Sequence, residues 1–228
     1  MSLKPSKCAK LEKKLAIYVA AAAGAVSIAP PVNAGVVYTK ANLLLTQGTL
    51  PIDLNHDGVD DFFLLNHEYA NYYYSGGFLA IVGNPQESPG VLGQNNQHGI
   101  KAFAVPLGVP VGPDSPAGFV SASGRFGAQM AFEFLSYNGR GLGGPWVNVG
   151  GKYLGFRFTL SDGVHYGWAR LSVNAALGPL PAVVAKLSGY AYEAIPNQSI
   201  PAGYRGFADH GSLGALSLGA AGLSPGKK

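Results

Sequence analysis

The segment 152–173 (KYLGFRFTLSDGVHYGWARLSV) repeats its pattern of apolar and polar residues every two positions. In its first half, alternate residues would share one face of a strand, namely Leu154, Phe156, Phe158 and Leu160. Asp162 and Gly163 then interrupt the pattern, and an Asp-Gly pair is a strong hairpin signal because both residues tolerate a positive φ. The sequence therefore predicts a β-hairpin over 152–173 that carries Phe158 and Trp168 into a hydrophobic core.

Further strand-like runs occur along the chain, each short and bounded by glycine, proline, asparagine or aspartate. Besides the two strands of the hairpin, they are residues 35–39, 61–69, 76–83, 100–105, 129–137 and 186–194. Long amphipathic helical patterns are missing, and two turn-rich segments, 84–99 and 106–118, are predicted to be loops. We therefore predict an all-β fold with a single antiparallel β-sandwich that is jelly-roll-like, and a closed barrel is the alternative.

The N-terminal segment has the arrangement of a secretory signal peptide. Five lysines between positions 4 and 14 precede an apolar, alanine-rich stretch, and small residues at Val32 and Ala34 precede a cleavage point at Gly35. The apolar stretch of about 14 residues is shorter than the roughly 20 that a transmembrane helix needs. We predict a signal peptide at 1–34, a β-domain at 35–205 and a flexible Gly/Ala/Leu-rich tail at 206–228.

Charge and cysteine content change once the signal peptide is removed. The cleavage would take away five lysines and Glu12, leaving eleven basic and eleven acidic residues. A neutral mature chain lacks the basic surface with which proteins bind nucleic acid or anionic membranes. Cys8, the only cysteine, would also be lost. An exported chain without cysteine cannot form disulfides, so another device must stiffen the fold, and a bound metal is one candidate.

The stretch DLNHDGVDD, residues 53–61, has the spacing of a calcium-binding loop. Oxygen ligands would come from Asp53, Asn55 and Asp57, from the carbonyl of Val59, and from Asp61 directly or through water. Calcium prefers six to eight oxygen ligands, and a glycine at position 6 permits the sharp bend of such loops. The alternative is an Asx-rich turn whose acidic side chains are solvated. We predict Ca²⁺ as the cofactor, because carboxylates this close together repel one another unless a cation lies among them.

The loop departs from an EF-hand in one important position. Position 12 is Leu64 in place of the bidentate glutamate, and the residues that follow the loop are strand-like rather than helical. The loop resembles instead the calcium loops of dockerins, thrombospondin type 3 repeats and FG-GAP propeller blades. That resemblance implies a calcium site outside the EF-hand context.

Aromatic residues suggest a second kind of site, and sequence signatures of catalysis are mostly missing. Consecutive tyrosines at Tyr72, Tyr73 and Tyr74 could form a sugar-stacking platform together with Trp146, although tyrosines in a strand also simply cover its two faces. The chain contains no HExxH, GxSxG or P-loop motif. A glycosidase would require the fold to bring together two carboxylates among Glu68, Glu133 and Glu193. We predict no catalytic residues and no enzymatic activity.

The C-terminal third resembles a segment of exported bacterial proteins of the PEP-CTERM and related surface-anchored type. The segments that carry the resemblance are YLGFRFTLSDGVHYGWARLSV and LSGYAYEAIPNQSIPAG. Such proteins place a signal peptide, an aspartate-rich loop and a β-rich body before a short C-terminal anchor. Here the Pro-Glu-Pro triplet is missing, and Ser224-Pro225-Gly226 replaces the arginine-rich end. The resemblance implies export and a sandwich-like body.

We therefore expect a secreted or cell-surface bacterial protein, stiffened by calcium, with a structural or interaction role in the extracellular matrix. The alternative is a carbohydrate-binding module. Expected partners are extracellular polysaccharide or other surface proteins. Membrane contact is expected only through the signal peptide or a weak C-terminal anchor.

Overall fold

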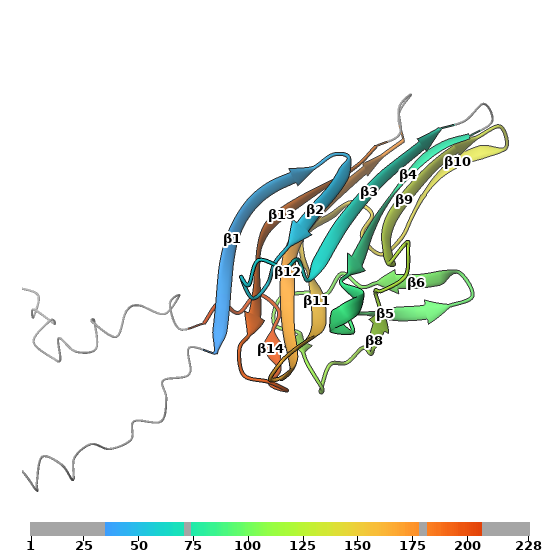
Figure 1. The fold of residues 1–228 in the computed structure, drawn as a ribbon. Coiled ribbons are helices and arrows are strands. Elements are labelled where there is room, and N and C mark those ends of the chain that lie inside the picture. The colour runs from blue at the N-terminus through green and yellow to red at the C-terminus, as the bar shows by residue number, and fades with distance from the viewer. Residues whose placement is uncertain (1–34, 71–73, 178–181, 207–228) are drawn as a thin grey trace, which may run out of the picture. The chain divides into compact units, whose positions relative to one another are not determined.

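The computed structural model describes residues 35–70, 74–177 and 182–206. The predicted signal peptide, Tyr72, Tyr73 and nearly all of the predicted tail lie outside the described residues. Strands and one short 3₁₀ helix make up this part of the chain (Figure 1). Their bounds are β1 Val36–Leu45, β2 Gly48–Ile52, β3 Phe62–Ala70, β4 Tyr74–Gly83, η1 Pro85–Glu87, β5 Gly90–Asn96, β6 Gly99–Ala102, β7 Pro110–Val111, β8 Phe119–Ser121, β9 Ala128–Ser136, β10 Gly139–Gly143, β11 Val149–Leu160, β12 Gly163–Ala176, β13 Ala182–Glu193 and β14 Ile200–Pro201.

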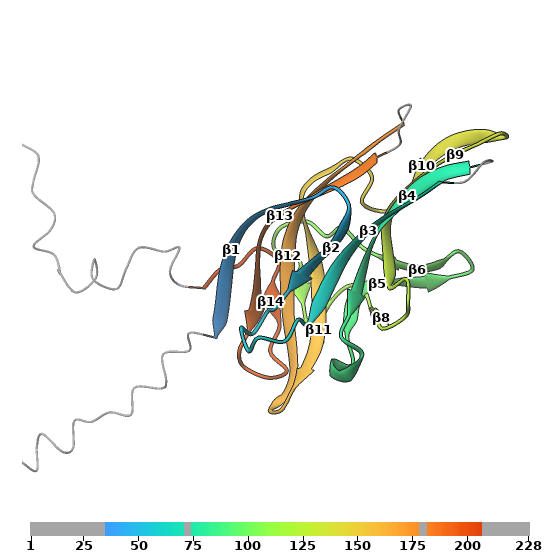
Figure 2. The same ribbon diagram turned by 45° about the horizontal axis from the view of Figure 1, so that its top comes forward.

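Most strands belong to one long sheet that curls until it is nearly closed. The strand order is β1-β13-β12-β11-β5-β6-β9-β4-β3-β2, with β10 added to β9 and β8 added to β5. The turn at Thr46 and Gln47 connects the first and last strands of this path directly. Figure 2 shows the half that contains β1, β13, β12 and β11 and the half that contains β2, β3, β4 and β9. All pairings except that of β6 with β9 are antiparallel.

The all-β prediction is confirmed, and each of the eight predicted strands overlaps a strand of the structure, although β1 extends to Leu45, beyond its predicted end at residue 39. The predicted loop at 84–99 is wrong, because it contains η1 and β5. Strand β5 joins the two halves of the sheet: Val91 pairs with Phe156 of β11, and Gly93 pairs with Ala102 of β6. Glycine and asparagine concealed this strand in the sequence. Gly93 is required because a Cβ there would lie 2.1 Å from the Lys101 carbonyl oxygen.

The hairpin predicted over 152–173 is confirmed. Strands β11 and β12 pair from Leu160 and Gly163 outward, around a two-residue turn. Phe158 and Trp168 are both fully buried, but they lie in different hydrophobic clusters on opposite faces of the sheet. The first cluster fills the space between the two halves of the sheet. The second lies on the outer face of β11 and β12, where β7 and β14 contact it, so this hairpin is buried on both faces.

No helix within residues 35–70, 74–177 and 182–206 is long and apolar enough to cross a membrane.

Candidate cation site

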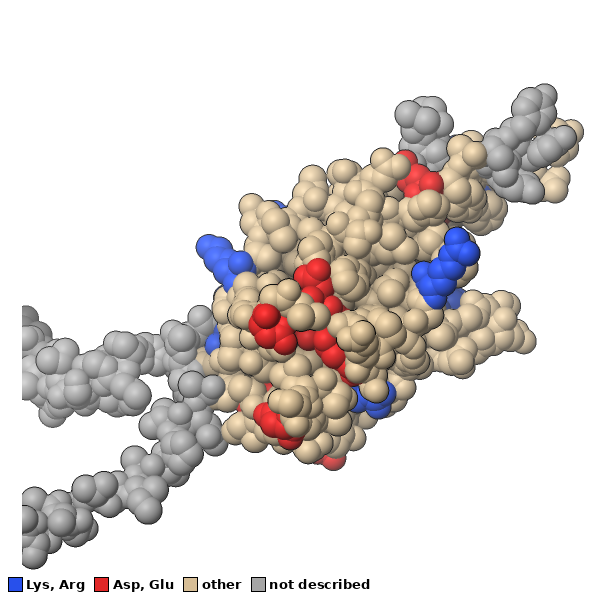
Figure 3. All heavy atoms as spheres, in the orientation of Figure 1, with Lys and Arg blue, Asp and Glu red and all other residues tan. Residues whose placement is uncertain are grey.

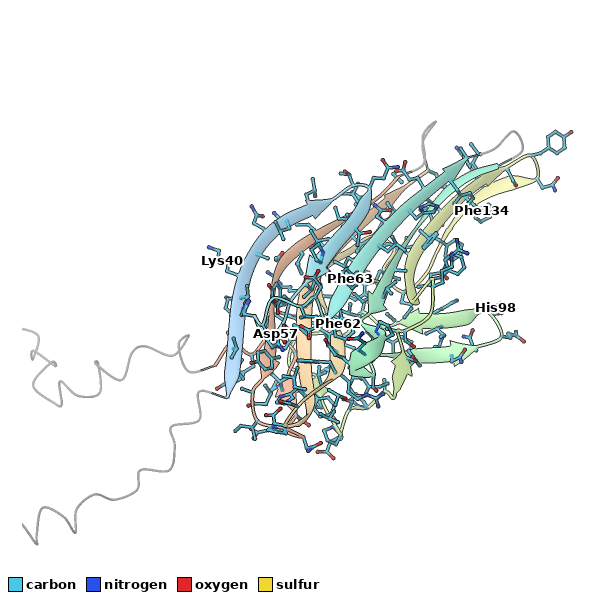
Figure 4. The ribbon with its side chains drawn as sticks, in the orientation of Figure 1. Lys40, Asp57, Phe62, Phe63, His98 and Phe134 are labelled. Carbon is cyan, nitrogen blue, oxygen red and sulfur yellow. The ribbon has the colours of Figure 1, made fainter. Side chains whose placement is uncertain are left out.

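The aspartate-rich loop connects β2 to β3 and is closed at its base. Ile52 and Phe62 are paired residues of the two strands, and the Asp61 N–H donates to the Ile52 carbonyl at 3.0 Å. Leu54 inside the loop is fully buried and belongs to the first hydrophobic cluster. Figure 4 labels Asp57 in the loop and Phe62 at the start of β3. The loop is therefore attached to the core at both ends, and its polar middle is exposed.

Hydrogen bonds between residues that are close in sequence fix the conformation of the middle of the loop. The two carboxylate oxygens of Asp53 accept from the N–H groups of His56 and Gly58, at 2.7 and 3.0 Å. Asn55 Oδ1 accepts from the Asp57 N–H at 3.1 Å, and Asp57 Oδ1 accepts from the Val59 N–H at 2.8 Å. Gly58 has a φ of 86°, which explains glycine at the sixth position of the loop. These bonds are those expected of the Asx-rich alternative, and they also orient the side-chain oxygens.

The same oxygens keep the capacity to bind a cation. An ionised carboxylate has about four acceptor positions, so Asp53 retains lone pairs after accepting two N–H groups. The Asn55 amide donates to Asp57 Oδ2 at 2.9 Å, and an ion bound between these side chains would replace that bond. In the described part of the chain, no three His, Cys, Asp or Glu side chains form a group that could hold a metal.

Asp61, at the ninth position of the loop, is the exception to this exposed arrangement. Its side chain is 1% exposed, and its Oδ2 accepts from the Leu54 N–H at 2.5 Å. Its Oδ1 is buried and has no hydrogen-bond partner among the described residues. Burial, together with the neighbouring carboxyl group of Glu87, raises the pKa of Asp61 to about 8. A buried carboxylate of this kind requires either a proton or a cation.

Glu87 is the site residue that the sequence did not reveal. It ends η1, and one of its oxygens, Oε2, is buried without a hydrogen-bond partner in the described part of the chain. Asn84 caps η1, donates from Nδ2 to Glu87 Oε1 at 2.9 Å, and donates from its backbone N–H to the Asp61 carbonyl at 2.8 Å. The order Asn-Pro-x-Glu signals a helix start. Nothing in the sequence links that start to the loop, because the link is a tertiary contact.

Acidic side chains gather at the centre of the face drawn in Figure 3, in the region where Figure 4 labels Asp57. Asp53, Asp57 and Asp60 belong to the exposed or half-buried part of the loop, above the buried Asp61. Most of the surrounding surface in this view is uncharged. This local negative charge favours a cation at the loop.

The predicted sugar-stacking platform requires a correction. Trp146 is fully buried in the first hydrophobic cluster, and its Nε1 donates to the Ala102 carbonyl at 3.1 Å. Its ring therefore has no face open to a sugar. Tyr72 and Tyr73 lie outside the described residues, as does the side chain of Tyr74. Trp146 is buried because its indole ring fills a core position and its N–H has a backbone acceptor there.

The fold brings together one of the carboxylate pairs that a glycosidase would need, although not as an open site. Glu68 and Glu133 both pair with Gly77 of β4, from opposite sides. Burial raises the pKa of Glu133, and the charge of Glu68 adds to the effect. Glu133 is 1% exposed, so a substrate could not reach its carboxyl group in this conformation.

The raised pKa of Asp61 predicts an unusual pH dependence in the absence of calcium. The folded-state pKa of about 8 lies above the ordinary value of 3.8, so the folded state binds the proton more tightly between these values. The free energy of unfolding should therefore fall as the pH rises from about 4 to about 8. Asp61→Asn should remove this contribution, worth more than about 1.4 kcal/mol, the equivalent of one pKa unit.

Urea unfolding in EDTA at several pH values measures this effect. Glu133 and Glu193 also have raised pKa values, whereas that of Asp162 is lowered by its hydrogen bond to His165. The difference between the wild-type chain and Asp61→Asn cancels these other groups. Parallel pH profiles for the two proteins would show that Asp61 titrates normally.

The candidate site thus combines an exposed aspartate-rich loop with a buried carboxyl pair from two separate segments. No model of a known protein family, no curated protein and no solved structure matches this chain.

Proposed function

We propose that the protein is an exported, calcium-stiffened β-domain with a structural or interaction role at the bacterial cell surface or in the extracellular matrix. The calcium ligands would be the side chains of Asp53, Asn55, Asp57 and Asp61 and the carbonyl of Val59. In this proposal the ion supplies no chemistry beyond charge and coordination. It holds the β2–β3 loop in one conformation and stabilises the folded state.

The observation that carries the proposal is the buried Asp61 at the ninth position of the loop. Its Oδ1 is buried and accepts from no N–H or O–H group among the described residues, and a coordinated cation would compensate its charge. Leaving a buried charged group without a partner costs several kcal/mol, so a chain that retains such a group needs a compensating interaction. Calcium suits the site because the surrounding ligands are hard oxygen atoms from carboxylate, amide and carbonyl groups.

The rest of the proposal rests on the sequence. The N-terminal basic and apolar segments and the segments similar to PEP-CTERM-type proteins support export and surface location. The two halves of the curled sheet would act as the two layers of a sandwich around the first hydrophobic cluster. Partners would be extracellular polysaccharide or other surface proteins, which a stiff β-domain without net charge can contact without an enzymatic site.

Calcium should raise the stability of the folded domain, because the unfolded chain has no preformed site. The gain should reach about 2.7 kcal/mol at a hundredfold excess of calcium over Kd. One loop without a position-12 glutamate should bind with a Kd on the order of 10⁻⁴–10⁻³ M. Thermal and urea unfolding in millimolar calcium and in EDTA measure the gain. Magnesium should substitute poorly, because it requires nearly octahedral coordination.

Asp57→Ala should abolish the calcium-dependent gain. This substitution also removes the hydrogen bond from the Val59 N–H, so the readout is the difference between calcium and EDTA rather than the absolute stability. Asp114→Ala, which removes an exposed carboxylate outside the loop, should leave the difference unchanged. An equal melting temperature for the wild-type chain in calcium and in EDTA would contradict the proposal and favour the Asx-rich turn.

A further inference from the structure

The carboxyl groups of Asp61 and Glu87 come from segments that are distant in sequence, yet they lie within hydrogen-bonding reach of each other. Each has one oxygen that accepts from an N–H group, of Leu54 or of the Asn84 side chain. Each also has one buried oxygen that accepts from no N–H or O–H group among the described residues, namely Asp61 Oδ1 and Glu87 Oε2. Two carboxylates so placed repel each other unless a proton or a cation lies between them.

The loop itself lacks the last acidic ligand of an EF-hand. The twelfth position is Leu64, which lies in β3 and is fully buried in the first hydrophobic cluster. Its side chain serves the core and cannot be exchanged for a ligand. A carboxylate that completes the site must therefore come from another segment, and Glu87 is the acidic residue beside Asp61.

We propose that Glu87 is a further calcium ligand, supplied by η1 and taking the place of the missing twelfth position. This inference rests on the proposed calcium site. The ion would then connect the β2–β3 loop to the segment between β4 and β5. Because η1 leads into β5, which joins the two halves of the sheet, the ion would also fix the start of that strand.

The local hydrogen bonds place Glu87 for this role. Asn84 Oδ1 accepts from the Gln86 N–H at 3.2 Å, which forms the first turn of η1, while Asn84 Nδ2 holds Glu87 Oε1. The Asn84 N–H is bonded to the Asp61 carbonyl at 2.8 Å, so the two segments are already aligned. One oxygen of each carboxylate is thereby held by a donor, and the other is buried and accepts from no donor among the described residues. Donors that hold one oxygen of a carboxylate in this way orient it as a metal ligand.

The test compares the wild-type chain with Glu87→Gln, which keeps the size of the side chain and removes its charge. Isothermal titration with calcium and the calcium-dependent rise in melting temperature are the measurements. The Kd for calcium should rise about tenfold or more. In EDTA the variant should be no less stable than the wild-type chain, because the glutamine amide can donate to Asp61 Oδ1.

Two control variants separate a lost ligand from a disturbed segment. Gln86→Ala changes the neighbouring exposed residue of η1, and Asp114→Asn neutralises an exposed carboxylate elsewhere. Both should bind calcium with the wild-type Kd. Infrared spectroscopy adds a direct readout, since a protonated carboxyl group seen in EDTA should lose its proton when calcium is added.

The outcomes are distinguishable. If the wild-type chain and Glu87→Gln bind calcium with the same Kd while Asp57→Ala does not bind, the loop is a calcium site and Glu87 is not its ligand. A protonated carboxyl signal that persists in saturating calcium in the wild-type chain and is missing from Asp61→Asn would also overturn the inference, because the pair would then share a proton. If the wild-type chain does not bind calcium at all, the proposed function fails and this inference fails with it.

Discussion

Trp168→Ala should lower the free energy of unfolding by about 3–5 kcal/mol, as truncation of large aromatic side chains in cores does. Trp168 is fully buried in the second hydrophobic cluster. Its ring meets that of Tyr153 edge-on, with 5.3 Å between the centroids, and its Nε1 donates to the Tyr204 carbonyl at 3.1 Å. The substitution therefore removes packing and a hydrogen bond together.

Equilibrium unfolding in urea measures this loss. Tyr137→Ala is the matched control, because Tyr137 is 97% exposed and its truncation should change stability by less than about 0.5 kcal/mol. The loss in free energy of unfolding for Trp168→Phe should lie between those for Trp168→Ala and Tyr137→Ala, because phenylalanine keeps an aromatic ring and lacks the indole donor. A loss below about 1 kcal/mol for Trp168→Ala would mean that the outer face of β12 is open to solvent.

Trp146→Ala should also lower the free energy of unfolding by about 3–5 kcal/mol, because it truncates a side chain of the first hydrophobic cluster. Trp146 is fully buried between the two halves of the sheet. Its Nε1 bond to the Ala102 carbonyl connects the segment after β10 to the end of β6, and its backbone N–H donates to the Met130 carbonyl at 3.0 Å. Alanine would leave both a cavity and a buried carbonyl without its donor.

The two tryptophans are the only ones in the chain, so each single variant leaves one fluorescent reporter in the other cluster. If the two clusters unfold together, each of the variants Trp146→Phe and Trp168→Phe should show the same unfolding midpoint by fluorescence as by circular dichroism. Leu107→Ala, at a side chain that is 71% exposed, is the control for truncation outside the core. A loss below about 1 kcal/mol for Trp146→Ala would mean that Trp146 is exposed, which would favour the sugar-binding hypothesis.

Much of the fold could be predicted from local patterns. The alternation of apolar residues in β11 and the Asp-Gly pair sufficed to predict the β11–β12 hairpin, because both are properties of neighbouring residues. The two turn residues are Ser161 and Asp162, and Gly163, with a φ of 144°, begins β12. Strand β5 escaped the same reasoning. Its residues are mainly glycine, asparagine and glutamine, with only Val91 and Leu92 apolar. It forms a hairpin with β6, and β11, which is distant in sequence, holds its other edge.

The alternation of apolar residues did not reveal that the β11–β12 hairpin is buried on both faces. Phe158 lies across from His165, and Trp168 lies across from Gly155. In this register, residues of the same parity in β11 and β12 point to opposite faces, so Phe158 and Trp168 cannot share a cluster. A sequence reading assigns one apolar face to a strand, whereas here Tyr153 and Trp168 make the second face a core of its own. The covering elements, β7 and β14, are two residues each and leave no periodic signal.

The aspartate-rich loop shows the same division. The spacing of Asp53, Asn55 and Asp57 and the position of Gly58 were readable in the sequence, because these residues form one continuous turn with its own hydrogen bonds. Asp61 looked equivalent to the other aspartates there. Only the tertiary structure buries it and brings Glu87 beside it, because both effects come from the packing of the loop against η1 and the core, which local spacing does not encode.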